Sequence, residues 1–295
     1  MKLIHRILVA TDFSPEAQLA VTRAGQLAQQ HEAELHVLHA TPDWQLFSRW
    51  TVAKKEHYDQ ITLRAQSLLH DEVERIRGKF GVPARGEVQL GKASEVIARA
   101  AAAYEPSLLV VGARGEHKPR YAPAALGGTA LKLILRGSPP LLLVRDRDTS
   151  AYRTSLAAIH EMSDLSKQIA EWGTSLVPGG DCHIVHAYET PYLERILACG
   201  LDEAEANACA QTAEVEARRN LEQLVTAIGP RSRVHLHLMR GNPLGVLVTE
   251  IARCAPQLVV VGRHEGPGRP TQQESFGDTG LRIAYHTPVD VLVIP

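Results

Sequence analysis

Residues 97–115 read IARAAAAYEPSLLVVGARG, and residues 248–266 read VTEIARCAPQLVVVGRHEG. In each stretch a proline, Pro106 or Pro256, separates a helix-like segment from a short apolar run that ends in glycine. The two prolines are 150 positions apart. An apolar run of this length between proline and glycine is typical of a strand that is buried on both faces of a parallel sheet.

The same spacing of 150 residues relates two further pairs of segments. GKASEVI (91–97) matches GNPLGVL (241–247), and LGGTALKLILRGSPPLLLVR (126–145) matches FGDTGLRIAYHTPVDVLVIP (276–295). A constant register over so much of the chain indicates an internal duplication.

The duplication divides the chain into two similar domains, residues 1–148 and 149–295. The polar segment DRDTSAYR (146–153) joins them. A chain of 295 residues also agrees with two domains of roughly 100–200 residues each.

Short strands alternate with helices in the first copy. Ser14 followed by Pro15 is a favoured helix start. The pattern predicts strands at 7–10, 34–40, 84–90, 107–112 and 139–145, and helices from Ser14 to about 31, at 50–80, at 94–104 and at 129–136. This alternation predicts an α/β fold, with a five-stranded parallel sheet and helices on both faces in each domain.

Ligands of such sheets bind beyond the carboxyl ends of the strands, where the strand order reverses. The loops that follow Thr11, Ala40 and Gly112 are therefore expected to meet. The terminal strands of the two copies would leave open edges, which pairing with each other within one chain would cover. Further association into a homodimer stays open.

Composition excludes several classes of partner. Lys and Arg number 32 against 33 Asp and Glu, and the net charge is −1, which gives no electrostatic case for binding nucleic acid or an anionic membrane. No run approaches ~18 apolar residues, and Asp12 interrupts the apolar N-terminal run, so we expect neither a membrane span nor a signal peptide. The four cysteines show no C-x-x-C spacing, so free thiols and a cytoplasmic location are expected.

A glycine-rich connection follows the fourth predicted strand. Gly112 and Gly115 are followed, after eleven residues, by Gly127, Gly128 and Thr129 at the start of a helix. Glycines let backbone N–H groups approach phosphate oxygens, and a helix N-terminus adds further donors. Taken alone, the same glycines would also suit an ordinary turn.

Four segments together resemble the universal stress protein family. They are ILVATDFS (7–14), LHA (38–40), LLVVGARG (108–115) and LGGTALKLILRGSPPLLLV (126–144). The resemblance implies the tandem two-domain type, with adenine-nucleotide α-hydrolase-like domains. Many members bind ATP or AMP through G-x2-G-x9-G-[S/T], whereas others bind no nucleotide.

The family motif can be carried onto the first domain with one ambiguity. Its last pair falls on Gly127-Gly128 or on Gly128-Thr129, and in either case the spacer is longer than nine residues. Asp12 stands where the family places an aspartate at the nucleoside end. The resemblance implies ATP or AMP, with Mg²⁺ in the case of ATP, bound by Ala10, Thr11, Asp12, Ala40, Val111, Gly112, Arg114, Gly115, Gly127, Gly128 and Thr129.

The second domain departs from the motif. His160 replaces Asp12, Glu265 replaces Gly115 and Asp278 replaces Gly128. A carboxylate at a phosphate contact opposes nucleotide binding unless a metal intervenes. These differences predict that the second domain has a degenerate nucleotide site or a site for a different small ligand.

Other candidate sites are weaker. GEVQLGKA (86–93) lacks the hydroxyl of a phosphate-binding loop and also reads as a strand. His36 and His39, like His183 and His186, lie three apart on a strand and so face opposite sides, which favours packing or hydrogen bonding. The remaining pair, His235 and His237, shares a face, but the sequence places no third zinc ligand beside it.

Two functions follow from these patterns. The first is a stress-response protein that binds an adenine nucleotide in its first domain as a regulatory ligand and contacts protein partners not identifiable from sequence. The alternative is a nucleotide-independent structural or interaction protein with another ligand in its second domain. We identify no catalytic residues and no metal site; at most a weak ATPase is expected, with Arg114 as a candidate charge stabiliser.

Overall fold

A computed structural model describes residues 3–45, 48, 55–114, 126–137, 139–188, 203–229, 232–263 and 278–295. The first half contains β1 (Arg6–Thr11), α1 (Pro15–His31), β2 (Glu34–Thr41), α3 (Lys55–Phe80), β3 (Ala84–Leu90), α4 (Ala93–Tyr104), β4 (Leu108–Gly112), α5 (Gly128–Arg136) and β5 (Leu141–Val144). The second half contains β6 (Thr154–Ile159), α6 (Asp164–Ser175), β7 (Asp181–Tyr188), α8 (Glu203–Ile228), β8 (Arg233–Arg240), α9 (Pro243–Cys254), β9 (Leu258–Gly262), α10 (Asp278–His286) and β10 (Asp290–Ile294).

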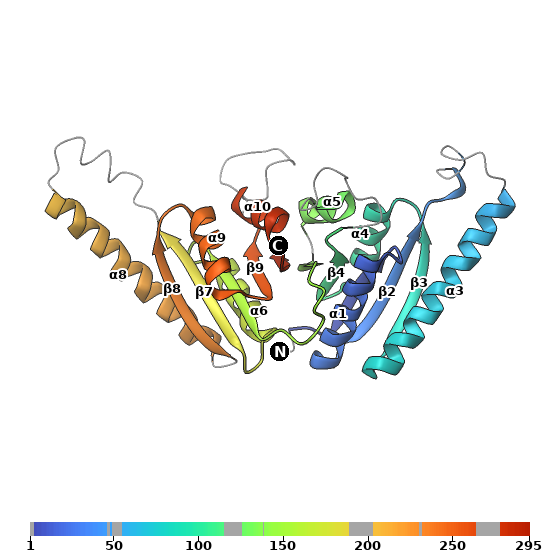
Figure 1. The fold of residues 1–295 in the computed structure, drawn as a ribbon, viewed down its shortest axis with the longest axis horizontal. Helices are drawn as coiled ribbons and strands as arrows, with labels where there is room; N and C mark the ends of the chain where they lie inside the picture. Colours follow the sequence, from blue (N-terminus) through green and yellow to red (C-terminus); the bar gives the residue numbers. More distant parts are fainter. Residues whose placement is uncertain are drawn as a thin grey trace.

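The ten strands of the described residues form one sheet in the order β3-β2-β1-β4-β5-β10-β9-β6-β7-β8. Strands within each half pair in parallel, whereas β5 and β10 pair antiparallel, with Leu142 opposite Leu292. Figure 1 shows the two halves side by side, with α3 and α8 at the outer ends of the molecule. The predicted pairing of the two terminal strands within one chain is therefore confirmed.

The helix boundaries have local causes that the repeat preserves. Ser14 caps α1 by accepting a hydrogen bond from the N–H of Ala17, and Pro15 occupies the first turn, as predicted. The helices α4 and α9 both end at a residue in the left-handed conformation, Glu105 (φ 47°) and Ala255 (φ 44°). A proline follows each of these residues and prevents the helix from continuing.

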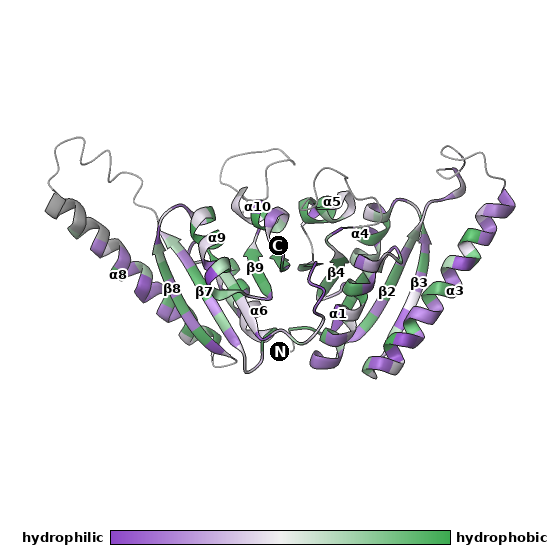
Figure 2. Ribbon diagram, viewed as in Figure 1, coloured by the Kyte–Doolittle hydropathy of each residue, from purple (hydrophilic) through white to green (hydrophobic). Residues whose placement is uncertain are grey.

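Helices cover both faces of the sheet, as predicted. One core lies beneath α1, α3, α6 and α8, and the other lies beneath α4, α5, α9 and α10. The residues of β4, β5, β9 and β10 are buried almost throughout. Figure 2 shows β4 and β9 as mainly hydrophobic, while α3 alternates between hydrophilic and hydrophobic positions.

Residues 86–90 of the segment that resembles a phosphate-binding loop belong to β3, so the predicted strand is confirmed. A Cβ at Gly86 would lie 2.8 Å from a methyl group of Val73 and 2.9 Å from the Leu69 side chain. Gly86 therefore allows α3 to pack closely on the sheet, and it does not form a ligand loop.

A buried charged cluster joins the two halves, and we call it the interdomain latch: Arg23, Tyr152 and Asp290. The Arg23 guanidinium lies 3.4 Å from the Asp290 carboxylate, and both side chains are fully buried. Tyr152 donates a hydrogen bond to Asp290 at 2.5 Å, and its ring lies 4.0 Å from the Arg23 guanidinium carbon. Asp290 also accepts from the backbone N–H groups of Arg145 and Asp146.

Arg145 adds a second contact between the halves. Its guanidinium donates to the carbonyl oxygens of Ala284, Tyr285 and Thr287, where α10 ends. A cation is favourable at this place because the last carbonyls of a helix carry partial negative charge. The first domain therefore caps a helix of the second.

Candidate functional site

A cavity of about 200 Å³ opens at the carboxyl edge of the first half of the sheet. There β1 lies between β2 and β4, so the chain leaves the sheet in opposite directions at this point. The structure places around this cavity all of the predicted site residues except Gly115, which lies outside the described residues. These are Ala10, Thr11, Asp12, Ala40, Val111, Gly112, Arg114, Gly127, Gly128 and Thr129.

Five apolar residues that the sequence patterns did not predict complete the lining. They are Ala17, Leu38, Ala93, Ile97 and Ala130. A signal was present for some of them: Leu38 shares a face of β2 with Ala40, and Ile97 lies one helical turn after Ala93. The cavity therefore combines an apolar wall with a polar rim.

The first turn of α5 presents backbone donors to the cavity. Gly127 is the N-cap and makes no side-chain capping bond, and its carbonyl accepts the first helical hydrogen bond, from Leu131 at 3.0 Å. The N–H groups of Gly128, Thr129 and Ala130 therefore have no acceptor within the helix. Because all three residues line the cavity, either alignment of the glycine motif places N–H donors there.

The loop after β1 is held by its own side chains. Asp12 accepts from the N–H of Ser14 at 3.0 Å, which links the turn to the cap of α1. Phe13 adopts a positive φ of 61° and stacks on His39, with ring centroids 4.4 Å apart. His39 Nδ1 lies 2.8 Å from the carbonyl oxygen of Thr11, to which it can only donate.

This hydrogen bond recurs in the second domain. His186 Nδ1 lies 3.0 Å from the carbonyl oxygen of Ile159, the last residue of β6. The prediction that His39 and His186 have a packing or hydrogen-bonding role is therefore confirmed. Each imidazole fixes the end of the neighbouring strand beside a cavity.

The pH dependence of stability follows from the buried histidines. Burial lowers the pKa of both His36 and His39, with Arg85 lowering that of His36 further. Below about pH 6.5 the unfolded chain therefore binds more protons than the folded chain at these positions. The free energy of unfolding is expected to fall as the pH drops from about 6.5 through the folded pKa values. Urea unfolding at about pH 7.5 and 5.5 measures this fall.

The variant His39→Gln checks the source of the effect. Glutamine carries no titrating group but retains an amide donor that can reach the Thr11 carbonyl. The difference in unfolding free energy between the two pH values is expected to shrink relative to the parent protein. An unchanged difference would mean that other groups account for the acid sensitivity.

Arginine side chains lie at and beside the rim of the first cavity, near the end of β4. The Arg114 Nε is buried and has no hydrogen-bond partner among the described residues. Arg114 also lines a neighbouring hollow of about 490 Å³, together with Arg145, Arg147 and one acidic residue, Glu16. Burial, together with the nearby Arg114, lowers the pKa of Arg145 to about 10. An anionic ligand would relieve this mutual repulsion of arginines.

The second domain has an equivalent but different cavity, of about 150 Å³. His160 stands where the first domain has Asp12, and Thr279 and Gly280 of α10 contribute to the lining. Asp278 begins α10 at the place that Gly128 has in α5. The glutamate at position 265 and the rest of the charged loop lie outside the described residues.

Comparison with known proteins agrees with this architecture. The sequence model of the universal stress protein family matches residues 4–145 and again residues 152–295. The chain therefore belongs to the universal stress protein family, in the tandem two-domain form. No protein with a curated description matches the sequence.

Solved structures share the fold over the whole chain. A universal stress protein from Archaeoglobus fulgidus DSM 4304 is 18% identical, with 98% of this chain and 97% of that chain covered and a TM-score of 0.66. A protein described as a universal stress protein from Pseudomonas aeruginosa UCBPP-PA14 is 18% identical, with coverages of 99% and 93% and a TM-score of 0.56.

A universal stress protein solved in complex with cAMP matches 50% of this chain and 98% of its own length, at 21% identity and a TM-score of 0.37.

None of the described helices combines the length and the apolar character that a membrane crossing demands.

Proposed function

We propose that the first domain binds an adenine nucleotide, ATP or AMP, as a regulatory ligand. The observation that carries the proposal is the convergence of three features on one cavity: the free N–H groups of α5, the Asp12 carboxylate and the Arg114 guanidinium. Donors and a cation suit phosphates, whereas a carboxylate suits hydroxyl or amino groups. A nucleotide carries both kinds of group.

The lining also suggests how the ligand would lie. The phosphates would approach Gly128 and Thr129, where the helix dipole favours negative charge. The base would lie against the apolar wall that includes Leu38 and Ile97, and Asp12 would accept from the ribose or the adenine amino group. Mg²⁺ would accompany ATP and neutralise part of its charge.

Regulation requires that the ligand bind two states of the protein with different affinity. Gly112 and Arg114 line the cavity on one side and Gly127–Thr129 on the other, so occupancy would favour one arrangement of these residues relative to each other. Protein partners would recognise that arrangement. The proposal includes a cytoplasmic location, a boundary between the domains at residues 148 and 149, and at most slow hydrolysis of ATP.

The test is the nucleotide content and nucleotide affinity of the purified protein. The protein is denatured, and the supernatant is run on an ion-exchange column; we expect close to one adenine nucleotide per chain. Calorimetry on stripped protein follows, with ATP, AMP and cAMP as ligands, and released phosphate is measured in the same ATP samples. No co-purified nucleotide together with no binding of millimolar Mg-ATP would refute the proposal.

The second candidate function is a nucleotide-independent interaction protein. The observation that favours it is the lining of the second cavity, where His160 replaces the carboxylate and most other residues are apolar. Such a lining suits a small, mainly apolar ligand. It predicts that nucleotides leave the melting temperature unchanged, whereas the first proposal predicts a rise.

A further inference from the structure

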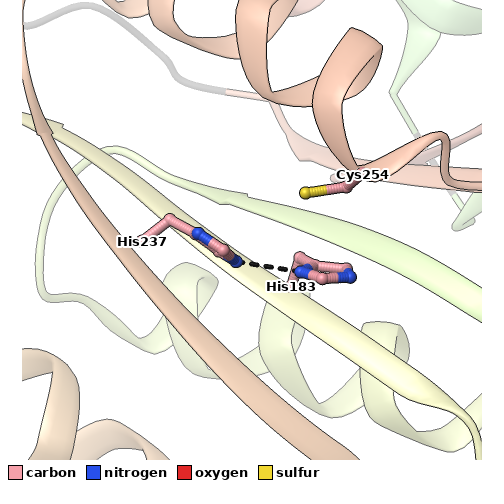
Figure 3. A group of neighbouring side chains, drawn as sticks. All are labelled: His183, His237 and Cys254. Carbon is pink, nitrogen blue, oxygen red and sulfur yellow. Dashed lines mark hydrogen bonds between the residues drawn. The ribbon is translucent and has the colours of Figure 1, made fainter.

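A cluster of three metal-binding side chains lies in the second domain, which we call the His-His-Cys cluster: His183 on β7, His237 on β8 and Cys254 at the end of α9. One potential ligand atom from each residue lies within 4.8 Å of the others. His183 Nδ1 and His237 Nε2 are 2.8 Å apart. Figure 3 shows the two rings facing each other, with the Cys254 side chain on the helix side of them.

The cluster is separate from the cavity of the second domain. Leu247 of α9 lines that cavity, and Cys254 lies about 10 Å further along the helix, at 1.5 Å per residue. His183 lies on β7, far in the sequence from β8 and α9, which follow each other directly. The pairing of β7 with β8 places His183 directly opposite His235 and two residues from His237.

The first domain has no such cluster at the equivalent place. There the register of β2 and β3 sets His36 beside Glu87, and the His36 ring and the Glu87 carboxylate are 3.5 Å apart. Tyr104, at the place of Cys254, packs edge-on against His36 with centroids 5.0 Å apart. The second domain has thus exchanged a carboxylate and a phenol for an imidazole and a thiol on the same scaffold.

A buried carboxylate supports the cluster. Glu250 is only 2% exposed, and its carboxylate lies 3.4 Å from His237 Nδ1. The first domain has Ala100 at this place. A carboxylate beside the second ring nitrogen is the usual outer partner of a metal-bound histidine, because it accepts that nitrogen's proton in a hydrogen bond.

We propose that His183, His237 and Cys254 bind a transition-metal ion of the zinc class. Tetrahedral zinc places two nitrogen ligands roughly 3.3 Å apart and nitrogen and sulfur roughly 3.6 Å apart. To bind zinc, His183 Nδ1 and His237 Nε2 would move apart by about half an ångström. The Cys254 sulfur would move toward them by about one ångström. Water would fill the fourth position, because Nε2 of the neighbouring His235 is hydrogen-bonded to Asp181 at 2.8 Å.

The proton positions would differ between the metal-free and the metal-bound cluster. Without metal, the Arg253 guanidinium can only donate to His237 Nδ1, at 2.6 Å, so a neutral His237 carries its proton on Nε2. Metal binding at Nε2 would move this proton to Nδ1, which would then donate to Glu250. The Arg253 guanidinium, which also donates to Glu250 at 2.6 Å, would release Nδ1. Cys254 loses its proton to solvent and binds as the thiolate. One proton is released for each ion bound.

The ligand types decide the class of metal. Thiolate and imidazole ligands favour zinc and the neighbouring transition metals, whereas calcium and magnesium require oxygen ligands. Three protein ligands with water in the fourth position also match sites that leave one position open to substrate or partner.

The test uses full-length, untagged protein after removal of metal with a chelator. Titration with Co²⁺ is expected to give visible bands of a tetrahedral ion and a thiolate-to-metal charge-transfer band, saturating at one equivalent, and Zn²⁺ should displace both. Cys254→Ser should lose the charge-transfer band and bind at least about tenfold more weakly, the loss typical for disturbed metal sites.

Two further variants complete the test. His237→Gln should weaken Zn²⁺ binding, whereas His36→Gln, at the place of His183 in the first domain, should bind like the parent. Zn²⁺ should raise the melting temperature of the parent and not that of Cys254→Ser, whose folding is checked by circular dichroism. Binding that is equal in the parent and in Cys254→Ser, or no uptake of metal by the parent, would overturn the proposal.

Discussion

Gly128→Asp is expected to reduce the affinity of the first domain for ATP by roughly 100-fold, while the protein remains as stable as the parent. Like charges about 4 Å apart interact by about 4 kcal/mol at an effective dielectric constant of 20, and about 2.8 kcal/mol corresponds to 100-fold. A Cβ at Gly128 meets no other atom within 4 Å, so the new side chain points into open space at the cavity. Calorimetry with ATP measures the loss.

The change has a built-in control for folding. A carboxylate in the first turn of a helix is favourable for the helix itself, and replacement of glycine reduces the freedom of the unfolded chain. The melting temperature should therefore stay the same or rise while the affinity falls. Gly128→Asn, with the same shape and no charge, should lose much less affinity; equal losses in the two variants would indicate steric blocking without a phosphate contact.

This variant also explains the second domain. Asp278 stands at the equivalent place there, so Gly128→Asp transfers one difference between the two domains into the first. If it abolishes nucleotide binding, a single position is enough to separate a nucleotide site from the site of a different ligand. The duplication would then have kept the scaffold and changed its chemistry at strand and helix ends.

The elements and the first cavity could be predicted because their signals are local or repeated. Ser14 and Pro15 mark the start of α1 within a few residues, and the strands are short apolar runs. The cavity followed from topology, since loops after neighbouring parallel strands meet where the strand order reverses. The pairing of β5 with β10 followed from the need to cover the open edges of two apolar strands.

The His-His-Cys cluster was missed because its members come from three elements. The pair His235 and His237 was recognised, but the register between β7 and β8, which sets His183 beside them, is not encoded near any of these residues. A signal did exist in the repeat. Comparing Glu87 with His237 and Tyr104 with Cys254 would have shown two metal-ligand residues gained at equivalent positions.

The partners within the interdomain latch could not be predicted from the sequence. Arg23 lies one helical turn from Leu19, Ala20 and Leu27, on the apolar side of α1, where an arginine is not normally expected. Its partner Asp290 comes from the last strand of the other domain, and only the folded sheet brings the two together. Long-range ion pairs of this kind depend on packing that sequence periodicity does not describe.

Asp290→Ala is expected to lower the free energy of unfolding by about 3–5 kcal/mol, which is the cost of leaving a buried charge without its partner. The substitution removes the acceptor for Tyr152 and for the backbone N–H groups of Arg145 and Asp146, as well as the ion-pair partner of Arg23. Chemical denaturation measures the loss, and the melting temperature should fall by roughly 10 °C, at about 2–4 °C per kcal/mol.

An exposed pair provides the matched control. Glu74 and Arg77 form an ion pair at 2.6 Å with both side chains about half exposed, so Glu74→Ala should cost less than about 1 kcal/mol. Replacing both charges of the latch, in Arg23→Met with Asp290→Asn, should be milder than Asp290→Ala, because no charge stays buried alone. If Asp290→Ala costs no more than Glu74→Ala, the buried pair does not hold the halves together, and the pairing of β5 with β10 must account for their association.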